Sequence, residues 1–399
     1  MTSRIEAIHD AASRIDANVT HSLGSIHEEI HDRDEDMKNA ITASAALLLT
    51  TTIANAGGID RTGNPYSILF EEGNYVQLSF SAAMPEVSGE YPAVPFGGGS
   101  TENMAESYFS AGVALKYEIN DQIDLAVMLN QPYGADANYT GGAYTGLTAE
   151  WNSTQLSVLA KYQANDAISV YGGLRAIQSE ATIAIPVALT MTADYDAETE
   201  KNTQVGYVIG AAYEKPEIAL RVALTYESGV THDFATAEYA NGALQLESTT
   251  DIEIPQTVTL DFQSGVAEDT LVFGSIRWSE WSVWEVRPAF FELASGGDRV
   301  TGIDDDVITY RLGVGRRIND DLSIFGRVTY EAGNGAEASR LSPTDGSTSI
   351  GIGGSYTMNG VKFTGGIEYA MLGDATDASG VEFEDNSAVG FGLSIGYAF

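Results

Sequence analysis

Residues 387–399 read SAVGFGLSIGYAF and are the last of the chain. Every second residue is large and apolar or aromatic, and the residues between them are Ala, Gly or Ser. Alternation with a period of two predicts a strand with two unlike faces. An apolar outer face and a small, polar inner face are typical of a strand that contacts lipid on one side and lines a lumen on the other. The segment therefore predicts an outer-membrane β-barrel, with the edge strand of a soluble sandwich as the alternative.

The same alternation recurs along the rest of the chain. Phe109, Val113 and Tyr117 share one face of a predicted strand, whereas Gly112 and Lys116 lie on the other. Charged residues fall on this second face in nearly every such segment. The pattern predicts fourteen strands, at residues 74–89, 106–119, 122–133, 150–164, 167–189, 201–214, 217–231, 250–265, 270–284, 306–318, 321–333, 347–358, 361–373 and 386–399.

The connections between these strands alternate in length. Six are tight turns, predicted at Asn120-Asp121, Asn165-Asp166, Lys215-Pro216, Ala267-Glu268, Asn319-Asp320 and Asn359-Gly360. Seven are longer loops rich in Gly and acidic residues, at 90–105, 134–149, 190–200, 232–249, 285–305, 334–346 and 374–385. A barrel of fourteen strands with both ends in the periplasm needs six turns and seven loops. The sequence thus predicts an all-β fold, a transmembrane antiparallel β-barrel of 14 strands.

An export signal lies within the chain and not at its start. Met37-Lys38-Asn39 precedes an apolar stretch at 40–53, and Ala54-Asn55-Ala56 follows it. This order predicts a signal peptide at 37–56. The apolar stretch is too short for a spanning helix, which needs about 20 residues. We interpret residues 1–36 as an upstream extension from a start codon placed too early; the alternative is a short helical seam that pairs with a partner.

Composition excludes several classes of function. The chain carries 20 basic and 56 acidic residues, and its formal net charge of −36 disfavours nucleic acid as a partner. It has no cysteine, which excludes disulfides and thiolate chemistry. Beyond residue 36 the only histidine is His232, which is too little for a histidine-based metal site or a Ser-His-Asp triad. We therefore expect a protein that is not an enzyme and that uses no cofactor or metal.

A barrel of this size encloses a wide lumen. Fourteen strands leave more space than the eight-stranded barrels that their own side chains fill. Charged residues predicted to point inward include Arg175, Arg221, Arg311 and Arg327. Two interpretations stay open for them: an ion-pair network that braces the wall, or a set of cations that attracts an anionic headgroup.

Several motifs occur in an informative order. Residues 254–262 (IPQTVTLDF) and 271–282 (LVFGSIRWSEWS) are a predicted strand pair that carries W-x-x-W as Trp278 and Trp281. They are accompanied by Asn64-Pro65 ahead of the first strand, by NQPYGAD at 130–136 and by LSIGYAF at 393–399. Together these motifs resemble the FadL-type family of outer-membrane transporters for long-chain fatty acids and other hydrophobic compounds (OMPP1/FadL/TodX). The resemblance covers most of residues 57–399.

The resemblance implies a monomer in the Gram-negative outer membrane, surrounded by its lipids and inserted by the barrel-assembly machinery through its C-terminal strand. It also implies a lateral exit at an inward kink of the third strand. In this chain the kink falls on Gln131, Pro132, Tyr133 and Gly134, because proline cannot donate a ladder hydrogen bond and glycine adds no side chain. The alternative is that Pro132 and Gly134 simply end the strand.

The family's N-terminal hatch is short in this chain. Only residues 57–72 separate the predicted signal peptide from the barrel at 73–399, so we expect a hatch remnant and a chain that nearly lacks a hatch. Asn64 and Pro65 lie in this remnant, and Ile68, Leu69 and Phe70 are expected to dock inside the lumen.

These observations predict a channel for uptake of long-chain fatty acids or other hydrophobic compounds, passive and with lateral release. The alternative is a general polar porin for small solutes. Trp278, Trp281 and Phe399 are interpreted as residues of the aromatic girdle or the wall. A spacing of three places the two tryptophans on opposite faces of a regular strand, so at most one of them faces lipid.

Overall fold

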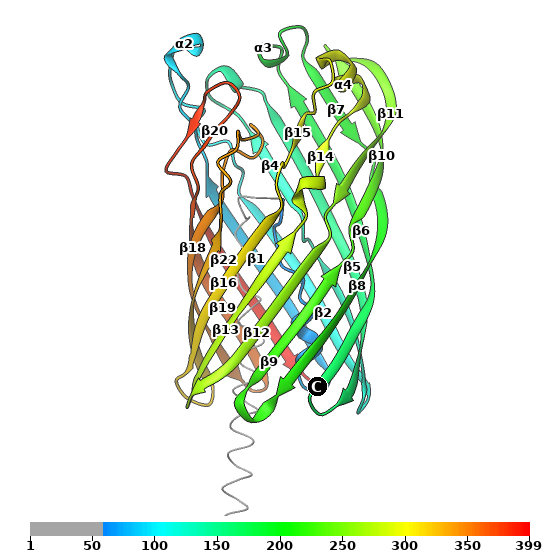
Figure 1. The fold of residues 1–399 in the computed structure, drawn as a ribbon, viewed down its shortest axis with the longest axis vertical. Coiled ribbons are helices and arrows are strands. Elements are labelled where there is room, and N and C mark those ends of the chain that lie inside the picture. Colours follow the sequence, from blue (N-terminus) through cyan, green and yellow to red (C-terminus); the bar gives the residue numbers. More distant parts are fainter. Residues whose placement is uncertain (1–58) are drawn as a thin grey trace, which may run out of the picture.

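Antiparallel strands make up most of residues 59–399, the part of the chain that the computed structural model describes (Figure 1). β1 (Tyr75–Glu86) pairs with β2 (Tyr108–Asn120) along one edge and with β22 (Ser387–Ala398) along the other. The pairing of the first strand with the last closes the sheet into a barrel. The predicted signal peptide and the extension ahead of it lie outside the described residues.

Eighteen strands of the sheet form fourteen wall strands, because four wall strands are interrupted and carry two labels each. The interrupted ones are β3 (Ile123–Asn130) with β4 (Gly134–Asn138), β7 (Tyr195–Thr199) with β8 (Asn202–Lys215), β9 (Leu220–Glu227) with β10 (Val230–Ala240), and β11 (Ala243–Ile254) with β12 (Thr257–Ala267). The uninterrupted ones are β1, β2 and β22, together with β5 (Thr148–Asn165), β6 (Ile168–Ile185), β13 (Thr270–Ser279), β16 (Val307–Arg317), β17 (Leu322–Glu331), β18 (Ser347–Met358) and β19 (Val361–Leu372). The predicted antiparallel barrel of fourteen strands is confirmed.

The two ends of the barrel differ. Short turns join the strands at the end where the C-terminus lies, here called the periplasmic end (Figure 1). All six predicted turns are present there, one of them as η4 (Pro216–Ile218). Longer loops stand at the opposite, extracellular end and carry α2 (Ala93–Phe96), η3 (Gly142–Tyr144), α3 (Val187–Thr190), η5 (Trp281–Val283), α4 (Ala289–Ser295) and two small strand pairs, β14 (Glu285–Val286) with β15 (Thr301–Gly302) and β20 (Ala375–Thr376) with β21 (Glu382–Phe383).

One predicted loop is largely strand. Most of residues 232–249 belong to β10 and β11, which pair with each other. The two strands therefore continue past the ends that apolar alternation predicts, at residues 231 and 250. The outward residues Thr231 and Asp233 are exposed and hydrophilic, so this part of the wall stands in water and lacks the pattern of a lipid face. A tight turn closes the hairpin, with φ of 49° at Asn241 and 71° at Gly242, as a two-residue hairpin turn requires.

Large apolar side chains cover the outer face of the barrel. Phe109 is 64 % exposed, Leu174 60 % and Ile352 62 %, which is the composition expected of a surface that contacts lipid. Phe399 lies at the periplasmic end, and its ring stacks on that of Tyr397 with 6.5 Å between centroids. Within residues 59–399 no helix is long and apolar enough to cross a membrane.

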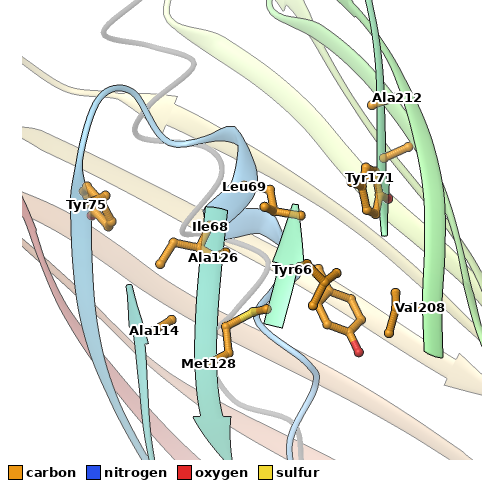
Figure 2. Close-up of a cluster of buried hydrophobic side chains, with 12 residues drawn as sticks. Tyr66, Ile68, Leu69, Tyr75, Ala114, Ala126, Met128, Tyr171, Val208 and Ala212 are labelled. Carbon is orange, nitrogen blue, oxygen red and sulfur yellow. The ribbon is translucent and has the colours of Figure 1, made fainter. Parts of the chain in front are cut away.

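Residues 59–74, here called the hatch segment, lie inside the barrel. Ile68 and Leu69, in η2 (Tyr66–Phe70), are fully buried in a cluster with Ala126 and Met128 of β3 and with residues of β2, β6 and β8 (Figure 2). The predicted docking of these two residues is therefore confirmed.

Contacts with the wall hold the short hatch segment in place, and lysines of the wall bind its backbone. The Nζ of Lys116 donates to the carbonyl of Glu71 at 2.8 Å, and that of Lys161 donates to the carbonyl of Leu69 at 2.9 Å. These inward lysines hold a segment of few residues in an ordered position inside the barrel.

Candidate functional site

An apolar cavity of about 80 Å³ lies in the extracellular half of the barrel and is the first element of the candidate site. Its walls come from β4 to β7, from β10 and β11, and from the loop between β13 and β16. Apolar and small residues dominate the lining, among them Ile59, Ala135, Ala181, Ile183, Ile252, Trp284 and Ile303. Alternation along the strands places Ala135, Ala181, Ile183 and Ile252 on the inner face, whereas Ile59, Trp284 and Ile303 lie outside the strands.

An aromatic cluster packs around this cavity. Trp151 lies edge-on to Phe234 at 5.6 Å and to Trp284 at 6.3 Å between ring centroids. Trp281 continues the cluster, 6.4 Å from Trp284 and 6.2 Å from Tyr133. Edge-to-face packing at these distances favours a rigid wall.

The position of Trp281 corrects the girdle interpretation for this residue. β13 ends at Ser279, and η5 turns the chain inward, so Trp281 is fully buried. Trp278 remains on the strand and is half-buried, and its indole Nε1 donates to Asp306 at 3.1 Å. Of the two tryptophans, only Trp278 is exposed enough to belong to the aromatic girdle.

A carboxylate fastens the loop that covers the cavity. Glu238 of β10 is fully buried, and its two oxygens accept hydrogen bonds from the backbone N–H groups of Phe290 and Phe291, at 2.8 and 2.9 Å. The hydroxyl of Tyr195 donates to the same carboxylate at 2.8 Å. These bonds hold the first turn of α4 against the wall, and the following residues of the loop line the cavity.

The third wall strand is broken where the sequence predicts a kink. Pairing between β2 and β3 ends at Val113 and Leu129. β4 then pairs with β5, and on its other side Ala137 forms an isolated bridge with Ala105, ahead of β2. Because β4 continues the strand after the break, Pro132 marks an interruption and not the end of the strand. Residues 108–112 of β2 thus have no strand partner on this side.

Other groups satisfy the backbone at this break. The carbonyl of Pro132 accepts from the N–H of Arg61 at 2.7 Å, and that of Gln131 accepts from the Thr62 hydroxyl at 2.8 Å. The N–H of Tyr133 donates to the hydroxyl of Ser153 at 3.0 Å. Three of these residues belong to the predicted path, and the hatch segment supplies two of their partners. The backbone groups named here are thus hydrogen-bonded although the ladder is interrupted, so the break is a stable part of the wall.

Arg61 fills the opening beside the break. Its guanidinium forms an ion pair with Asp136 of β4 and lies 4.6 Å from the ring centroid of Tyr108 of β2. A Cβ added at Gly134 would lie 2.3 Å from the Nε of Arg61, so the approach of this side chain requires glycine at position 134. Arg61 therefore bridges the two strands that lack a ladder between them.

A second cavity, of about 120 Å³, lies at this opening. Arg61, Tyr108 and Gly134 line it, and it shares Ala135, Leu341 and Ser342 with the apolar cavity. The apolar cavity thus adjoins the broken side of the wall.

The hatch segment is hydrogen-bonded to several wall strands across the lumen. Asn64 donates to Glu227 at 2.7 Å and accepts from Gln155 at 2.8 Å. Pro65, which follows it, precedes η2. Asp60 accepts two hydrogen bonds from Arg277, at 2.7 and 3.1 Å. Polar contacts of this kind tie the segment to opposite sides of the lumen.

The four predicted path arginines lie outside the apolar cavity. Arg175 is fully buried and pairs with Glu227 at 2.9 Å, and Arg327 pairs with Glu368. Arg221 donates to Gln263 at 3.0 Å, and it lines a separate polar cavity of about 150 Å³ together with Arg311. The bracing interpretation thus fits Arg175 and Arg327, and the structure brings no arginine of this set to the apolar cavity.

Sequence reasoning missed Arg61, Trp151 and Trp284. Arg61 lies in a turn-prone stretch that offered no sign of its partner. Trp284 was the last residue of a predicted strand, and Trp151 was one of the first residues of another. Their common signal, aromatic residues at the extracellular ends of predicted strands, fits a girdle equally well.

Comparisons with known proteins agree with this architecture. Residues 44–397 match the family model described as outer membrane protein transport protein (OMPP1/FadL/TodX). The fold is similar to that of a FadL homologue from Pseudomonas aeruginosa (TM-score 0.68, 14 % identity, 88 % of this chain and 98 % of that one). It is also similar to the toluene transporter TodX of Pseudomonas putida (TM-score 0.61, 12 % identity, 90 % of this chain and 98 % of that one). A third similar structure is the toluene transporter TbuX of Ralstonia pickettii (TM-score 0.58, 13 % identity, 83 % of this chain and 90 % of that one).

No curated protein matches the sequence. The family match nevertheless spans nearly all of the described residues. The chain belongs to the OMPP1/FadL/TodX family of Gram-negative outer-membrane proteins, which transport hydrophobic compounds and are not enzymes.

Proposed function

We propose that this protein takes up small hydrophobic molecules passively, binds them in the apolar cavity and releases them sideways through the break in the third wall strand. One observation carries the proposal: the apolar cavity adjoins the opening between β2 and β4, whereas polar contacts tie the hatch segment across the lumen on the straight route. A hydrophobic molecule that follows this path avoids the polar lumen.

The energetics favour such a path. Each methylene group loses about 0.8 kcal/mol of favourable transfer free energy when it is hydrated. A molecule that passes from the apolar cavity to the membrane interior stays out of water. Moving the same molecule through the cavity that Arg221 and Arg311 line would place it beside charged and hydroxyl groups.

In this proposal Gln131, Pro132, Tyr133 and Gly134 form the exit, and Arg61 closes it at rest. The ion pair with Asp136 and the contact with Tyr108 cross the opening, so a substrate leaves only when Arg61 moves aside. The polar contacts of the hatch segment oppose the alternative of a general porin, because they occupy the lumen that small solutes would cross.

The test fills the cavity. Ala181→Leu adds three carbon atoms to the lining of the apolar cavity, and Ala235→Leu makes the same change on the exposed outer face of β10. Uptake of labelled toluene is measured in cells with equal surface amounts of each barrel. We expect Ala181→Leu to slow uptake severalfold and Ala235→Leu to leave it unchanged.

Equal uptake by the two variants would contradict the proposal. A vesicle-swelling assay with small sugars distinguishes the porin alternative, because a porin would admit the sugars at the same rate in wild type and in Ala181→Leu.

A further inference from the structure

We infer that the apolar cavity selects neutral molecules that carry one hydrogen-bond acceptor, such as a ketone, ester or ether on an apolar ring, over carboxylates of similar size. The inference rests on the proposed function, since it names the substrate class of the same cavity. It depends on three separate observations: unpaired donors in the lining, the absence of cations among the described lining residues, and an acidic rim.

Three polar groups in the lining are buried and unpaired. They are the indole Nε1 atoms of Trp151 and Trp284 and the hydroxyl of Thr250, and all three residues line the apolar cavity. Buried polar groups almost always have a partner in native proteins, and each that lacks one costs about 1–3 kcal/mol. Because both indoles can only donate, a ligand that meets them must offer an acceptor.

The aromatic cluster provides no positive charge at neutral pH. His232 packs against Trp151 and Phe234, and burial lowers the pKa of its ring to about 4. Its Nδ1 lies 3.0 Å from the side-chain oxygen of Asn202, so the neutral ring carries its proton on this nitrogen. The buried Nε2 then has a lone pair and no charge to offer an anion.

The charges near the cavity are unfavourable for a carboxylate. Glu150 is the one charged residue among the described residues of the lining, and it is exposed. A carboxylate that entered would lose its hydration without meeting a cation of this lining, which is costly in an apolar site. The guanidinium of Arg61 in the adjoining cavity is already paired with Asp136, and Glu106 adds a further negative charge there.

The rim of the cavity adds to this effect. An adjoining surface cavity shares Ile303 and Ser342 with the apolar cavity. Six residues of its lining are acidic: Asp304, Asp305, Asp306, Glu331, Glu337 and Asp345. Arg299 pairs with Asp304, so the remaining charge of this surface is negative. A surface of this sign lowers the local concentration of anions and leaves that of neutral molecules unchanged.

Size limits the ligand further. The apolar cavity has a volume of about 80 Å³ and its neighbour at the wall about 120 Å³. An apolar cavity of about 150 Å³ accommodates benzene. A molecule with a single ring therefore fits across the two adjoining cavities with small side-chain movements.

The experiment compares three ligands of similar size, namely ethylbenzene, acetophenone and benzoate. Their affinities for the purified full-length barrel in detergent are measured by calorimetry at pH 7. We expect acetophenone to bind about fivefold more tightly than ethylbenzene, which corresponds to one hydrogen bond, and benzoate to bind more weakly than either.

Two variants test the donors. Trp284→Phe removes the indole N–H and keeps an aromatic ring, and Thr250→Val removes the hydroxyl at constant shape. Either change should reduce the preference for acetophenone over ethylbenzene. Trp278→Phe is the matched control, because this indole already has a partner in Asp306 and lies outside the cavity lining.

Each result has a distinct meaning. Benzoate binding as tightly as acetophenone, or a preference that persists in both variants, would overturn the inference. Binding of none of the three ligands, or equal toluene uptake by the Ala181→Leu and Ala235→Leu barrels, would count against the proposed function itself. Equal binding of ethylbenzene and acetophenone with normal uptake would overturn only the inference.

Discussion

Replacing Arg61 by alanine should open the side of the barrel. The guanidinium is 9 % exposed and pairs with Asp136, which is 24 % exposed, and it also lies over the ring of Tyr108. Loss of one partner of a buried ion pair costs about 3–5 kcal/mol, and partial exposure places this pair below that range. The cation–π contact adds about 0.5–1 kcal/mol. In the proposed function these contacts together favour the closed opening by about 2–4 kcal/mol.

Since 1.4 kcal/mol corresponds to a tenfold change in an equilibrium, a loss of about 2–4 kcal/mol in Arg61→Ala should raise the open fraction by about 30-fold or more. The assay is the initial rate of labelled toluene uptake by cells at equal surface abundance. We expect the uptake rate to rise by less than the open fraction, to about tenfold, because entry from the medium then limits the rate.

Two further variants make this result interpretable. Arg61→Ala combined with Asp136→Asn removes the carboxylate that the single variant leaves unpaired, so it separates opening from local destabilisation. Arg299→Ala breaks a more exposed ion pair, with Asp304 at the same end of the barrel, and should have no effect on uptake. Wild-type uptake in both Arg61 variants, with the barrels folded, would refute the role of Arg61 as the closure of a lateral exit.

Three other outcomes are expected. Ala105→Cys with Ala137→Cys joins two bridge partners above the opening, in a chain without native cysteine, so oxidation should slow uptake and reductant should restore it. Trp281→Ala should lower the unfolding free energy by about 3–5 kcal/mol in urea titrations, and Trp278→Ala by clearly less. Because the pKa of His232 is lowered to about 4, the unfolded chain binds more protons below pH 6.5; stability should fall from pH 6.5 to 4, and His232→Gln should flatten this dependence.

The membrane part of the wall could be predicted because lipid imposes a strict pattern on it. Outward residues such as Phe109 and Leu174 must be apolar, and their inward neighbours need not be. Above the lipid this constraint ends. Thr231 and Asp233 face water, so this part of β10 lacks the apolar alternation that predicts a strand. Its hydrogen-bonded ladder with β11 nevertheless continues to the turn at Asn241.

The break in the third strand was visible in the sequence, but its meaning was not. A proline and a glycine at these positions give the same local signal whether they interrupt a strand or end it. The difference lies in the pairing of residues 134–138 with β5, which no local pattern reveals. The same holds for Trp281: a regular strand would place it opposite Trp278, whereas the end of β13 at Ser279 frees the chain to turn inward.

The start of the hatch segment connects the parts of the site. Ile59 lines the apolar cavity, Asp60 binds Arg277 of β13, and Arg61 fills the opening at the broken strand. These three residues are consecutive, so a displacement of one by more than a bond length or two must displace the others. A ligand that presses on Ile59 therefore acts on the closure at Arg61 through the backbone, while the ion pair of Asp60 resists the movement. The proposed function therefore predicts that three adjacent residues of this short segment couple binding to release.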